Sequence, residues 1–433
     1  MTEQTSALPI KPDRRDRMVT DLLAWYRVQK RDLPWRGASP YAVWVSEIML
    51  QQTQVVTVIP FFLRFLERFP TVEALASAPI EEVLLHWAGL GYYARARNLH
   101  RAAQIVVAQH GGKVPDAPDI IETLPGIGRY TAGAILSIAY NRPRPLVDAN
   151  VIRVLSRLFG LHGDPKSAVN QTALWGLATE LVQAAHDSPG DFNQGLMELG
   201  ALVCEPSEPK CERCPLLQDC VAGNSPDPSA LPEFPPNKAS IAVTHSAAIL
   251  RNNAGEVLVV QRPLHGLWGG LWEFPRVACI SGETPQEGAI RAAREIAGLE
   301  VRIGAKIGKV KHGVAHHRIT LYGFEALLKE EGLSSENTLS KKDLSEENSL
   351  EEILIEETLL KEKGGEYESA SIPPLPSDIL PSDILPSTVL PSRWVRLDAL
   401  KNYAFSSPQV LLRDSLQEFV TRHQIGDLQQ TLF

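Results

Sequence analysis

Apolar residues recur at helical spacing through the first half of the chain. Val151, Val154, Leu155 and Leu158, for example, fall three or four positions apart, which places them on one face of a helix. Several such segments open with Pro, Asp or Ser, residues that favour the start of a helix. The pattern predicts an all-α region.

The second half of the chain has a different pattern. Short apolar runs typical of strands occur at Ile241–Leu250 and Val257–Gln261, with a turn sequence at 253–255 between them. A stretch with helical spacing follows near Glu287–Ala297. This order predicts an α+β domain.

A stretch rich in proline and serine separates the two patterns. We expect a helical domain over residues 1–222, a linker over 223–240 and the α+β domain over 241–433. Within the second domain, a low-complexity segment at 329–390 ends in a proline repeat that excludes helix and central strand. We expect this insertion to be largely disordered, and its stretch at 350–361 leaves open a helix that binds an unidentified protein partner.

Composition narrows the class of protein. Of the 433 residues, 44% are hydrophobic and 22% charged, as in globular proteins, and no apolar run approaches the ~20 residues that span a membrane. The stretch Met1–Arg17 is polar and lacks the apolar core of a signal peptide. We therefore expect a soluble cytoplasmic protein without a membrane partner.

The net charge of −8 is concentrated in the insertion. Residues 329–390 hold fifteen acidic and five basic residues, a balance of −10, so the rest of the chain carries +2. Residues 1–223 are nearly neutral, with 22 basic and 23 acidic residues. A positively charged surface that binds a nucleic acid could form only if the fold gathers basic side chains on one face. Composition therefore neither supports nor excludes a nucleic acid as partner.

Four of the five cysteines lie close together and indicate a metal site. Cys204, Cys211, Cys214 and Cys220 have the spacing C-x6-C-x2-C-x5-C, and a reducing compartment argues against disulfides. Zinc ribbons favour two C-x2-C pairs, whereas this chain has one, so the spacing favours an iron–sulfur cluster while leaving zinc open. Cys279 stands alone and is expected to be a small buried side chain.

A glycine turn precedes one of the predicted helices. In the segment 124–131, Gly126 and Gly128 permit a tight turn, and the helix start after it would direct backbone N–H groups at an anion such as a nucleic-acid phosphate. Taken alone, this motif more often marks an ordinary turn between helices than a phosphate site.

Two carboxylates are candidates for chemistry. Glu47 lies among apolar residues of SEIMLQQTQ, surroundings that would raise its pKa and keep it protonated as a general acid. The alternative is an exposed helix residue. Asp148 lies where a helix N-cap is expected, just before Val151, so simple capping is the alternative for this residue.

Together, the glycine turn, Asp148 and the cysteine loop resemble the helix-hairpin-helix superfamily of DNA glycosylases. Four further segments are similar to its adenine-specific branch, the MutY family: RDLPWR at 31–36, WVSEIMLQQTQV at 44–55, GLGYYARARNLH at 89–100 and FNQGLMELGALVC at 192–204. The resemblance covers most of the chain. It implies a monomeric base-excision repair enzyme that removes adenine mispaired with 8-oxoguanine or guanine in duplex DNA.

The resemblance also assigns roles to single residues. It implies that Glu47 protonates adenine and that Asp148 stabilises an oxocarbenium-like sugar, with support from Tyr130 and Asn150. It implies a [4Fe–4S] cluster on the four clustered cysteines. The residues that match the pocket for the flipped adenine are Arg31, Trp35, Arg36, Leu50 and Gln194. The residues that match DNA contacts, including the wedge that assists base flipping, are Gln52, Thr53, Leu90, Tyr92, Gly126, Gly128 and His316.

Three rival functions fit the sequence less well. Related pyrimidine-damage glycosylases with lyase activity carry a Schiff-base lysine where this chain has Tyr130, which implies a monofunctional enzyme. A non-catalytic iron–sulfur DNA-binding protein would need neither Glu47 nor Asp148. A nucleotide pyrophosphohydrolase would need paired glutamates that the segment 282–300 lacks.

The second domain resembles the MutT-like, Nudix-type C-terminal domain of this family, most closely in LWGGLWEFP at 267–275. This implies a role in recognising 8-oxoguanine. Family members use a loop of the form H-x-F-S-H, which stands here as HGVAH at 312–316. Val314 and Ala315 replace an aromatic ring and a hydroxyl group, so His316 is the part of the loop that carries over.

The Ala315→Ser variant is expected to raise the preference for adenine opposite 8-oxoguanine over adenine opposite guanine, because it restores a hydrogen-bonding group toward the lesion. The ratio of single-turnover excision rates on the two duplexes measures this preference. An unchanged ratio would show that the loop alignment is wrong.

Overall fold

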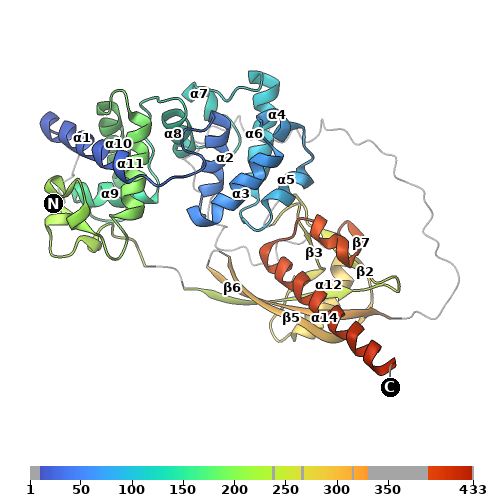
Figure 1. The fold of residues 1–433 in the computed structure, drawn as a ribbon. Coiled ribbons are helices and arrows are strands. Elements are labelled where there is room, and N and C mark those ends of the chain that lie inside the picture. Colours follow the sequence, from blue (N-terminus) through green and yellow to red (C-terminus); the bar gives the residue numbers. More distant parts are fainter. Residues whose placement is uncertain (1–9, 237–238, 265–267, 315, 330–388, 432–433) are drawn as a thin grey trace, which may run out of the picture.

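The computed structural model describes residues 10–236, 239–264, 268–314, 316–329 and 389–431. Ala315, the stretch at 350–361 and the proline repeat up to residue 388 lie outside the described residues. At the end of the predicted insertion the expectation of disorder is wrong: Leu390 is buried, and its N–H donates to the carbonyl oxygen of Ile296 at 3.0 Å. The predicted fold class is confirmed: a helical domain is followed by an α+β domain (Figure 1). None of the helices within the described ranges is long and apolar enough to cross a membrane.

The helical domain consists of two lobes with separate apolar cores. The first lobe contains α2 (Pro40–Leu50), α3 (Val55–Arg68), α4 (Val72–Ser77), α5 (Ile80–Trp87), α6 (Ala94–His110) and α7 (Pro118–Ile121). The second contains α1 (Pro12–Gln29), α9 (Ala149–Phe159), α10 (Ala168–Ala184) and α11 (Pro189–Leu202). The helix α8 (Arg129–Ile138) contributes side chains to both cores, and it lies between the two groups in Figure 1.

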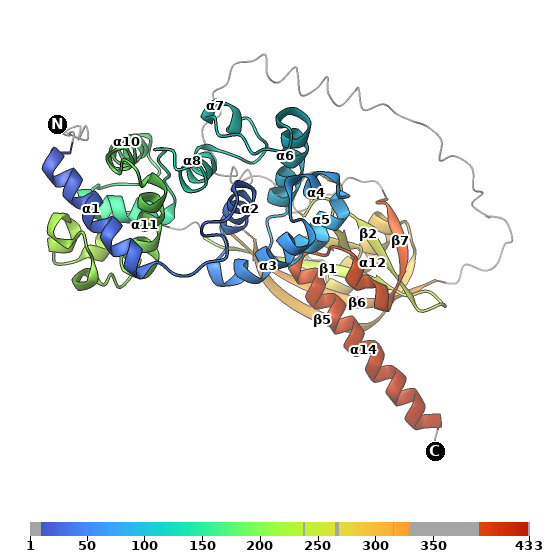
Figure 2. The ribbon, with the colours of Figure 1, turned by 45° about the horizontal axis from the view of Figure 1, so that its top comes forward.

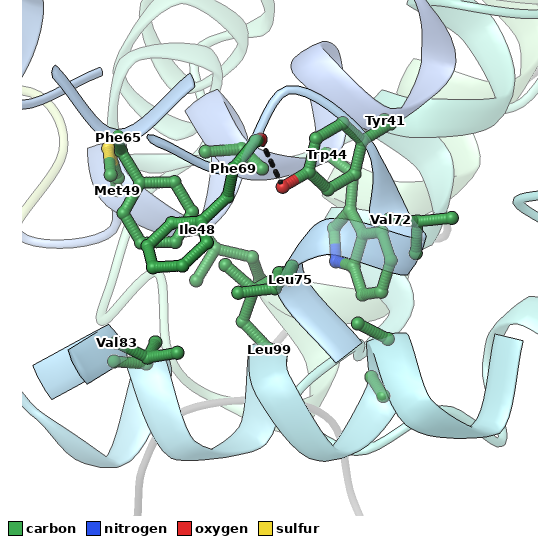
Figure 3. Close-up of a cluster of buried hydrophobic side chains, with 14 of the residues drawn as sticks. Tyr41, Trp44, Ile48, Met49, Phe65, Phe69, Val72, Leu75, Val83 and Leu99 are labelled. Atoms are coloured by element: carbon green, nitrogen blue, oxygen red, sulfur yellow. Dashed lines mark hydrogen bonds between the residues drawn. The ribbon is translucent and has the colours of Figure 1, made fainter. Parts of the chain in front are cut away.

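The helix α2 is the centre of the first lobe. Every residue from Tyr41 to Met49 is buried, which is expected of a helix that is apolar on all sides. Figure 3 shows Trp44 and Ile48 of this helix among side chains from α3, α4, α5 and α6. At its start, the Tyr41 hydroxyl donates a hydrogen bond to the carbonyl oxygen of Phe69, at 3.0 Å. The chain thus forces Glu47, which belongs to the same run, into the protein interior.

The second domain is built on two β-sheets. The order is β4-β1-β6-β5 in one sheet and β3-β2-β7 in the other, and β1 and β6 run parallel. The strands are β1 (Ile241–Leu250), β2 (Glu256–Gln261), β3 (Trp272–Glu273), β4 (Arg276–Ala278), β5 (Val301–Val314), β6 (His317–Leu328) and β7 (Ser392–Arg396). The strands predicted at 241–250 and 257–261 are therefore present.

Two helices cover the larger sheet of this domain. The helix α12 (Pro285–Ala297) begins two residues before the predicted stretch, with a capping box formed by Thr284 and Glu287. Its apolar residues pack on β1, β5 and β6. The helix α14 (Ser407–Thr431) packs Leu412 and Leu416 against the opposite side, and it runs along β5 in Figures 1 and 2.

The two domains are in direct contact. The Tyr93 hydroxyl donates to the carbonyl oxygen of Phe405 at 3.1 Å, and Arg97 Nη1 donates to that of Gly269 at 2.7 Å. Leu271 and Ala404 of the second domain belong to the core of the first lobe. The segment after α5 and the start of α6 are thereby fixed against the second domain.

The position of α8 depends on a missing side chain. A Cβ atom added at Gly133 would lie 2.0 Å from the carbonyl oxygen of Pro145, and backbone at that position cannot move aside easily. The glycine therefore allows the segment that leads into Asp148 to lie directly on α8.

The Gly133→Ala variant is expected to lower the free energy of unfolding by roughly 2 kcal/mol or more, because the added methyl group overlaps backbone. Gly176→Ala is the matched control, since Gly176 also lies inside a helix but its Cβ would meet nothing within 4 Å. The control is expected to gain up to about 1 kcal/mol from helix propensity. Urea unfolding of both variants checks this, and equal effects would contradict the packing argument.

Candidate active site

The carboxyl group of Glu47 lies in the interior at the boundary between the lobes. The residue is 3% exposed, and the alternative of an exposed helix residue is wrong. The Tyr130 hydroxyl, at the start of α8, donates a hydrogen bond to Glu47 Oε2 at 2.8 Å. Burial raises the pKa of Glu47 to about 7; the bond from Tyr130 opposes this shift and the nearby charge of Asp148 adds to it. This carboxyl group can therefore hold a proton near neutral pH.

Asp148 is both a helix cap and a member of the same cluster. It is the N-cap of α9, where its Oδ1 accepts a hydrogen bond from the backbone N–H of Val151 at 2.7 Å. Its Oδ2 accepts from Asn150 Nδ2 at 2.9 Å. Burial raises the pKa of Asp148, while these hydrogen bonds to the charged form lower it. The capping interpretation is confirmed, and the charge of the same carboxylate contributes to the raised pKa of Glu47.

Hydrogen bonds connect Asp148 to the cysteine loop. Asn150 Oδ1 accepts from Arg153 Nη2 at 2.9 Å, and Arg153 Nε donates to the carbonyl oxygen of Cys204 at 2.7 Å. Arg153 Nη2 also donates to the carbonyl oxygen of Gly200 at 2.9 Å. If the cysteine loop moved, the side chains of Arg153 and Asn150 would transmit the movement to Asp148.

The four clustered cysteines line one cavity with Arg157, Val203, Pro209, Leu217, Gly223 and Pro228. Two of the sulfur atoms accept hydrogen bonds, Cys204 Sγ from Arg157 Nη1 at 3.4 Å and Cys220 Sγ from the Gly223 N–H at 3.2 Å. Such donors stabilise thiolates that ligate a metal. In the described part of the chain, no three His, Cys, Asp or Glu side chains converge closely enough to share a single ion. Because they line one cavity, the four cysteines form one candidate metal centre.

The cysteine loop is fixed to α1 by an ion-pair cluster. Asp219, between Cys214 and Cys220, accepts hydrogen bonds from Arg17 Nη2 and from Arg17 Nε at 2.6 and 3.0 Å. Arg14 Nη2 donates to the carbonyl oxygen of Asp219 at 2.6 Å. The loop therefore has a defined position relative to the second lobe.

A second polar cluster lies between the 31–36 segment and α11. Glu198, which is 3% exposed, accepts from Arg31 Nε at 2.9 Å and from Arg36 Nη2 at 2.9 Å. Arg36 Nη1 donates to Gln194 Oε1 at 2.7 Å, so this bond orients the amide. Three predicted pocket residues thus meet, held by a glutamate that sequence reasoning missed. Its position four residues after Gln194 on the same helix could have indicated it.

The other predicted pocket residues lie nearby in the first lobe. Trp35 is buried and meets Phe62 edge to face, with ring centroids 5.3 Å apart. Leu50, at the end of α2, is half-buried against the same core. Met197 of α11 places its sulfur 3.8 Å from the Tyr130 hydroxyl, so α11 also reaches the Glu47 site.

The predicted DNA contacts differ in their exposure. Gln52 and Tyr92 lie on the surface, and Tyr92 is 52% exposed, whereas Leu90 is buried in the core of the first lobe. Gly126 has a φ of +78°, which favours glycine, and Gly128 is the N-cap of α8. Thr53 faces inward and accepts a hydrogen bond from Arg95 at 3.2 Å. His316 lies between β5 and β6, with its ring 4.2 Å from that of His317.

Comparison with known proteins identifies both domains. Residues 45–178 match the HhH-GPD superfamily of base excision DNA repair proteins, and residues 246–353 match the NUDIX domain. The adenine DNA glycosylase of Mus musculus is 39% identical over 370 residues, which cover 73% of this chain and 72% of that protein. The Schizosaccharomyces pombe enzyme is 32% identical, with 74% and 84% coverage. The human enzyme is 39% identical, with 70% and 66% coverage.

The chain belongs to the adenine DNA glycosylase family. In this adenine DNA glycosylase, Glu47 and Asp148 lie within the residues that match the HhH-GPD superfamily, and the cysteine loop follows the matched residues. The NUDIX match of this glycosylase starts inside β1. In its α12 region, Glu283 accepts two hydrogen bonds from Arg291, at 2.8 Å each, and Glu287 is used in the capping box. Both carboxylates thus already have structural partners.

The Glu47→Gln variant is expected to be more stable than the wild type at alkaline pH. Folded Glu47 keeps its proton up to a pH of about 7, against an ordinary value of 4.5, so folding becomes less favourable as pH rises through this window. A neutral amide removes this cost. The gain in the free energy of unfolding should be up to about 3 kcal/mol at pH 8 and about 1 kcal/mol at pH 5.

Urea unfolding at the two pH values measures the difference, with Glu67→Gln on the exposed surface of α3 as the control. A gain that does not depend on pH would refute the assignment of a raised pKa to Glu47.

Proposed function

We propose that this chain removes adenine from duplex DNA where adenine faces 8-oxoguanine or guanine, and that it does so without cutting the strand. The observation that carries the proposal is the burial of the Glu47 carboxyl group at the Tyr130 hydroxyl, within reach of the charge of Asp148. Two carboxyl groups with separated roles suit cleavage of an N-glycosidic bond, because one can protonate the leaving base and the other can stabilise the positive charge on the sugar.

The reaction follows from the two environments. Glu47 donates its proton to N7 of the flipped adenine, the bond between C1′ and the base breaks, and adenine leaves as a neutral molecule. The carboxylate of Asp148 stabilises the positive charge that develops on the sugar. A water oxygen then bonds to C1′, and the proton it releases returns to Glu47. The products are free adenine and an abasic site.

Tyr130 and Asn150 support these two groups. The pKa of Tyr130 is raised well above its ordinary value by burial, so the phenol stays neutral and remains a donor to Glu47. An uncharged phenol is no substitute for the amine that forms a Schiff base, which favours a monofunctional enzyme over a glycosylase with lyase activity. Asn150 donates to Asp148 and favours its charged form.

The cluster of Arg31, Arg36, Gln194 and Glu198, with Trp35 and Leu50, is the proposed pocket for the extruded base. Fixed, charge-assisted hydrogen bonds there keep the polar groups in one geometry before the base arrives. Because the glycosidic bond cannot be reached inside the stack, the base must leave the duplex first.

A [4Fe–4S] cluster is the proposed group for Cys204, Cys211, Cys214 and Cys220. Bound there, it would cross-link a loop that holds little apolar core of its own, and the four residues would ligate it as thiolates. The hydrogen bonds to two of the sulfurs suit metal-bound thiolates, and the spacing with a single C-x2-C pair favours the cluster over zinc.

The second domain, which we place at 241–433 after a linker at 223–240, is proposed to read the lesion rather than hydrolyse nucleotides. Its candidate carboxylates at α12 are occupied by Arg291 and by the helix cap. His316 lies at the junction of β5 and β6, at the end of a long hairpin that can reach a duplex. Duplex DNA is thus the proposed partner, bound by a monomer.

The direct test uses purified protein with labelled duplexes that contain A:8-oxoguanine, A:G or C:8-oxoguanine, each analysed with and without alkali. Strand breaks that require both adenine and alkali support a monofunctional adenine glycosylase. Breaks without alkali would indicate lyase activity, and the absence of breaks in all three duplexes would overturn the proposal. Glu47→Gln should eliminate adenine release while leaving duplex binding nearly intact.

The pH profile of single-turnover excision tests the proton donor. The rate should decline above a pH of about 7, as Glu47 loses its proton. Tyr130→Phe removes a hydrogen bond that stabilises the carboxylate, so it should raise the pKa of Glu47 and move the alkaline decline to higher pH. A decline that stays in place, or that moves to lower pH, would contradict the assignment of Glu47 as the acid.

A further inference from the structure

Two surface loops of the first lobe hold non-glycine residues in the left-handed backbone region. Gln52 has a φ of +56° in the loop after α2, and Tyr92 has a φ of +50° in the loop before α6. Such conformations cost about 1 to 3 kcal/mol each, and they persist where the surrounding structure holds them. Both side chains lie on the surface, and contact with solvent does not explain why the backbone is held in a strained conformation.

One buried arginine lies between these loops. Arg95, in the first turn of α6, is 4% exposed although it carries a full charge on a long side chain. Its Nη1 donates to three carbonyl oxygens at the end of α2, those of Ile48 and Met49 at 2.9 Å each and that of Gln51. Its Nη2 donates to the other loop, to the carbonyl oxygens of Leu90 and Gly91 at 3.4 and 3.2 Å. Nη2 also reaches Thr53 Oγ at 3.2 Å.

Charge and packing suit this position. The carbonyl groups at the end of a helix carry partial negative charge, and the Arg95 guanidinium meets the last ones of α2. The guanidinium carbon lies 5.5 Å from the Trp87 ring and 5.3 Å from the Tyr92 ring, within the range of cation–π attraction. Arg95 therefore contacts the backbone of both loops and the exposed ring of Tyr92.

The loop after α2 is held from its other side as well. Gln51 Nε2 donates to Thr131 Oγ at 3.2 Å, in the first turn of α8. Thr131 follows Tyr130, the hydrogen-bond partner of Glu47. The two loops and the Glu47 site thus form one connected unit.

We infer that Arg95 is a positioning residue for base extrusion: it holds the loops of Gln52 and Tyr92 in strained conformations that place these two side chains for entry into the duplex. The inference rests on the proposed function, because extrusion matters only if a base in a duplex is the substrate. Arg95 touches neither the base nor the sugar in this scheme, and the chemistry at Glu47 and Asp148 does not depend on it directly.

The test separates extrusion from chemistry. Arg95→Lys keeps the charge but loses the forked geometry, and Arg95→Met keeps the length and loses both. Each is assayed under single turnover on two duplexes, one with adenine opposite 8-oxoguanine and one with adenine opposite an abasic site, where no partner base restrains the adenine. A positioning role predicts a loss of roughly tenfold or more on the first duplex and a much smaller loss on the second.

A second readout reports the loops directly. 2-Aminopurine placed next to the target adenine should brighten when wild-type protein unstacks it, and this change should be reduced in both variants. Arg68→Met is the matched control, because Arg68 lies in the same lobe and pairs with Glu82 on the surface. Thermal unfolding of all variants shows which of them fold.

The outcomes are distinct. Equal losses on the two duplexes with an unchanged fluorescence response would overturn the inference and leave Arg95 a residue of general stability. If Arg95→Met does not fold, the excision rates of Arg95→Lys and the wild type on the two duplexes are compared instead. Failure of the wild type to release adenine from either duplex would instead refute the proposed function, whatever the variants do.

Discussion

The constraint on which the site depends is the burial of a carboxyl group in a helix that has no solvent-facing side. The helix α2 is buried from Tyr41 to Met49, so Glu47 cannot turn to water, and the cost of ionising it inside the protein raises its pKa to about 7. The neighbouring helices complete the site around the buried Glu47 carboxyl group. The start of α8 supplies Tyr130 as hydrogen-bond donor, and α11 closes the site from the second lobe.

The polar groups around Glu47 form continuous networks rather than isolated pairs. One runs from Asp148 through Asn150 and Arg153 to the cysteine loop. Another joins Arg31 and Arg36 to Glu198. Buried polar groups are costly unless each one has a partner, so such networks fix geometry more firmly than single bonds would. The site thereby gains a rigid arrangement before substrate binds.

The sequence predicts those parts of the molecule that depend on local pattern. The fold classes of the two domains, the first two strands of the second domain, the helix near 287–297 and the cap at Asp148 all follow from spacing and residue type. Burial of Glu47 could be anticipated from its apolar neighbours. The roles of Glu198, Arg153 and Arg95 could not, because each depends on partners 44 to 167 residues away or on backbone groups that no side-chain pattern reveals. A charged residue near the start of a helix, as Arg95 is, would ordinarily be exposed.

The arrangement of the lobes has a consequence for biosynthesis. The first lobe, built from α2 to α7, is contiguous in the chain and can assemble while the ribosome is still translating. The second joins α1 to α9, α10 and α11, so α1 must wait for partners made some 140 residues later. The apolar face of α1, with Met18, Val19 and Leu22, stays uncovered during that interval. A nascent chain of this protein therefore exposes the apolar face of α1 to other hydrophobic surfaces until α11 has been synthesised.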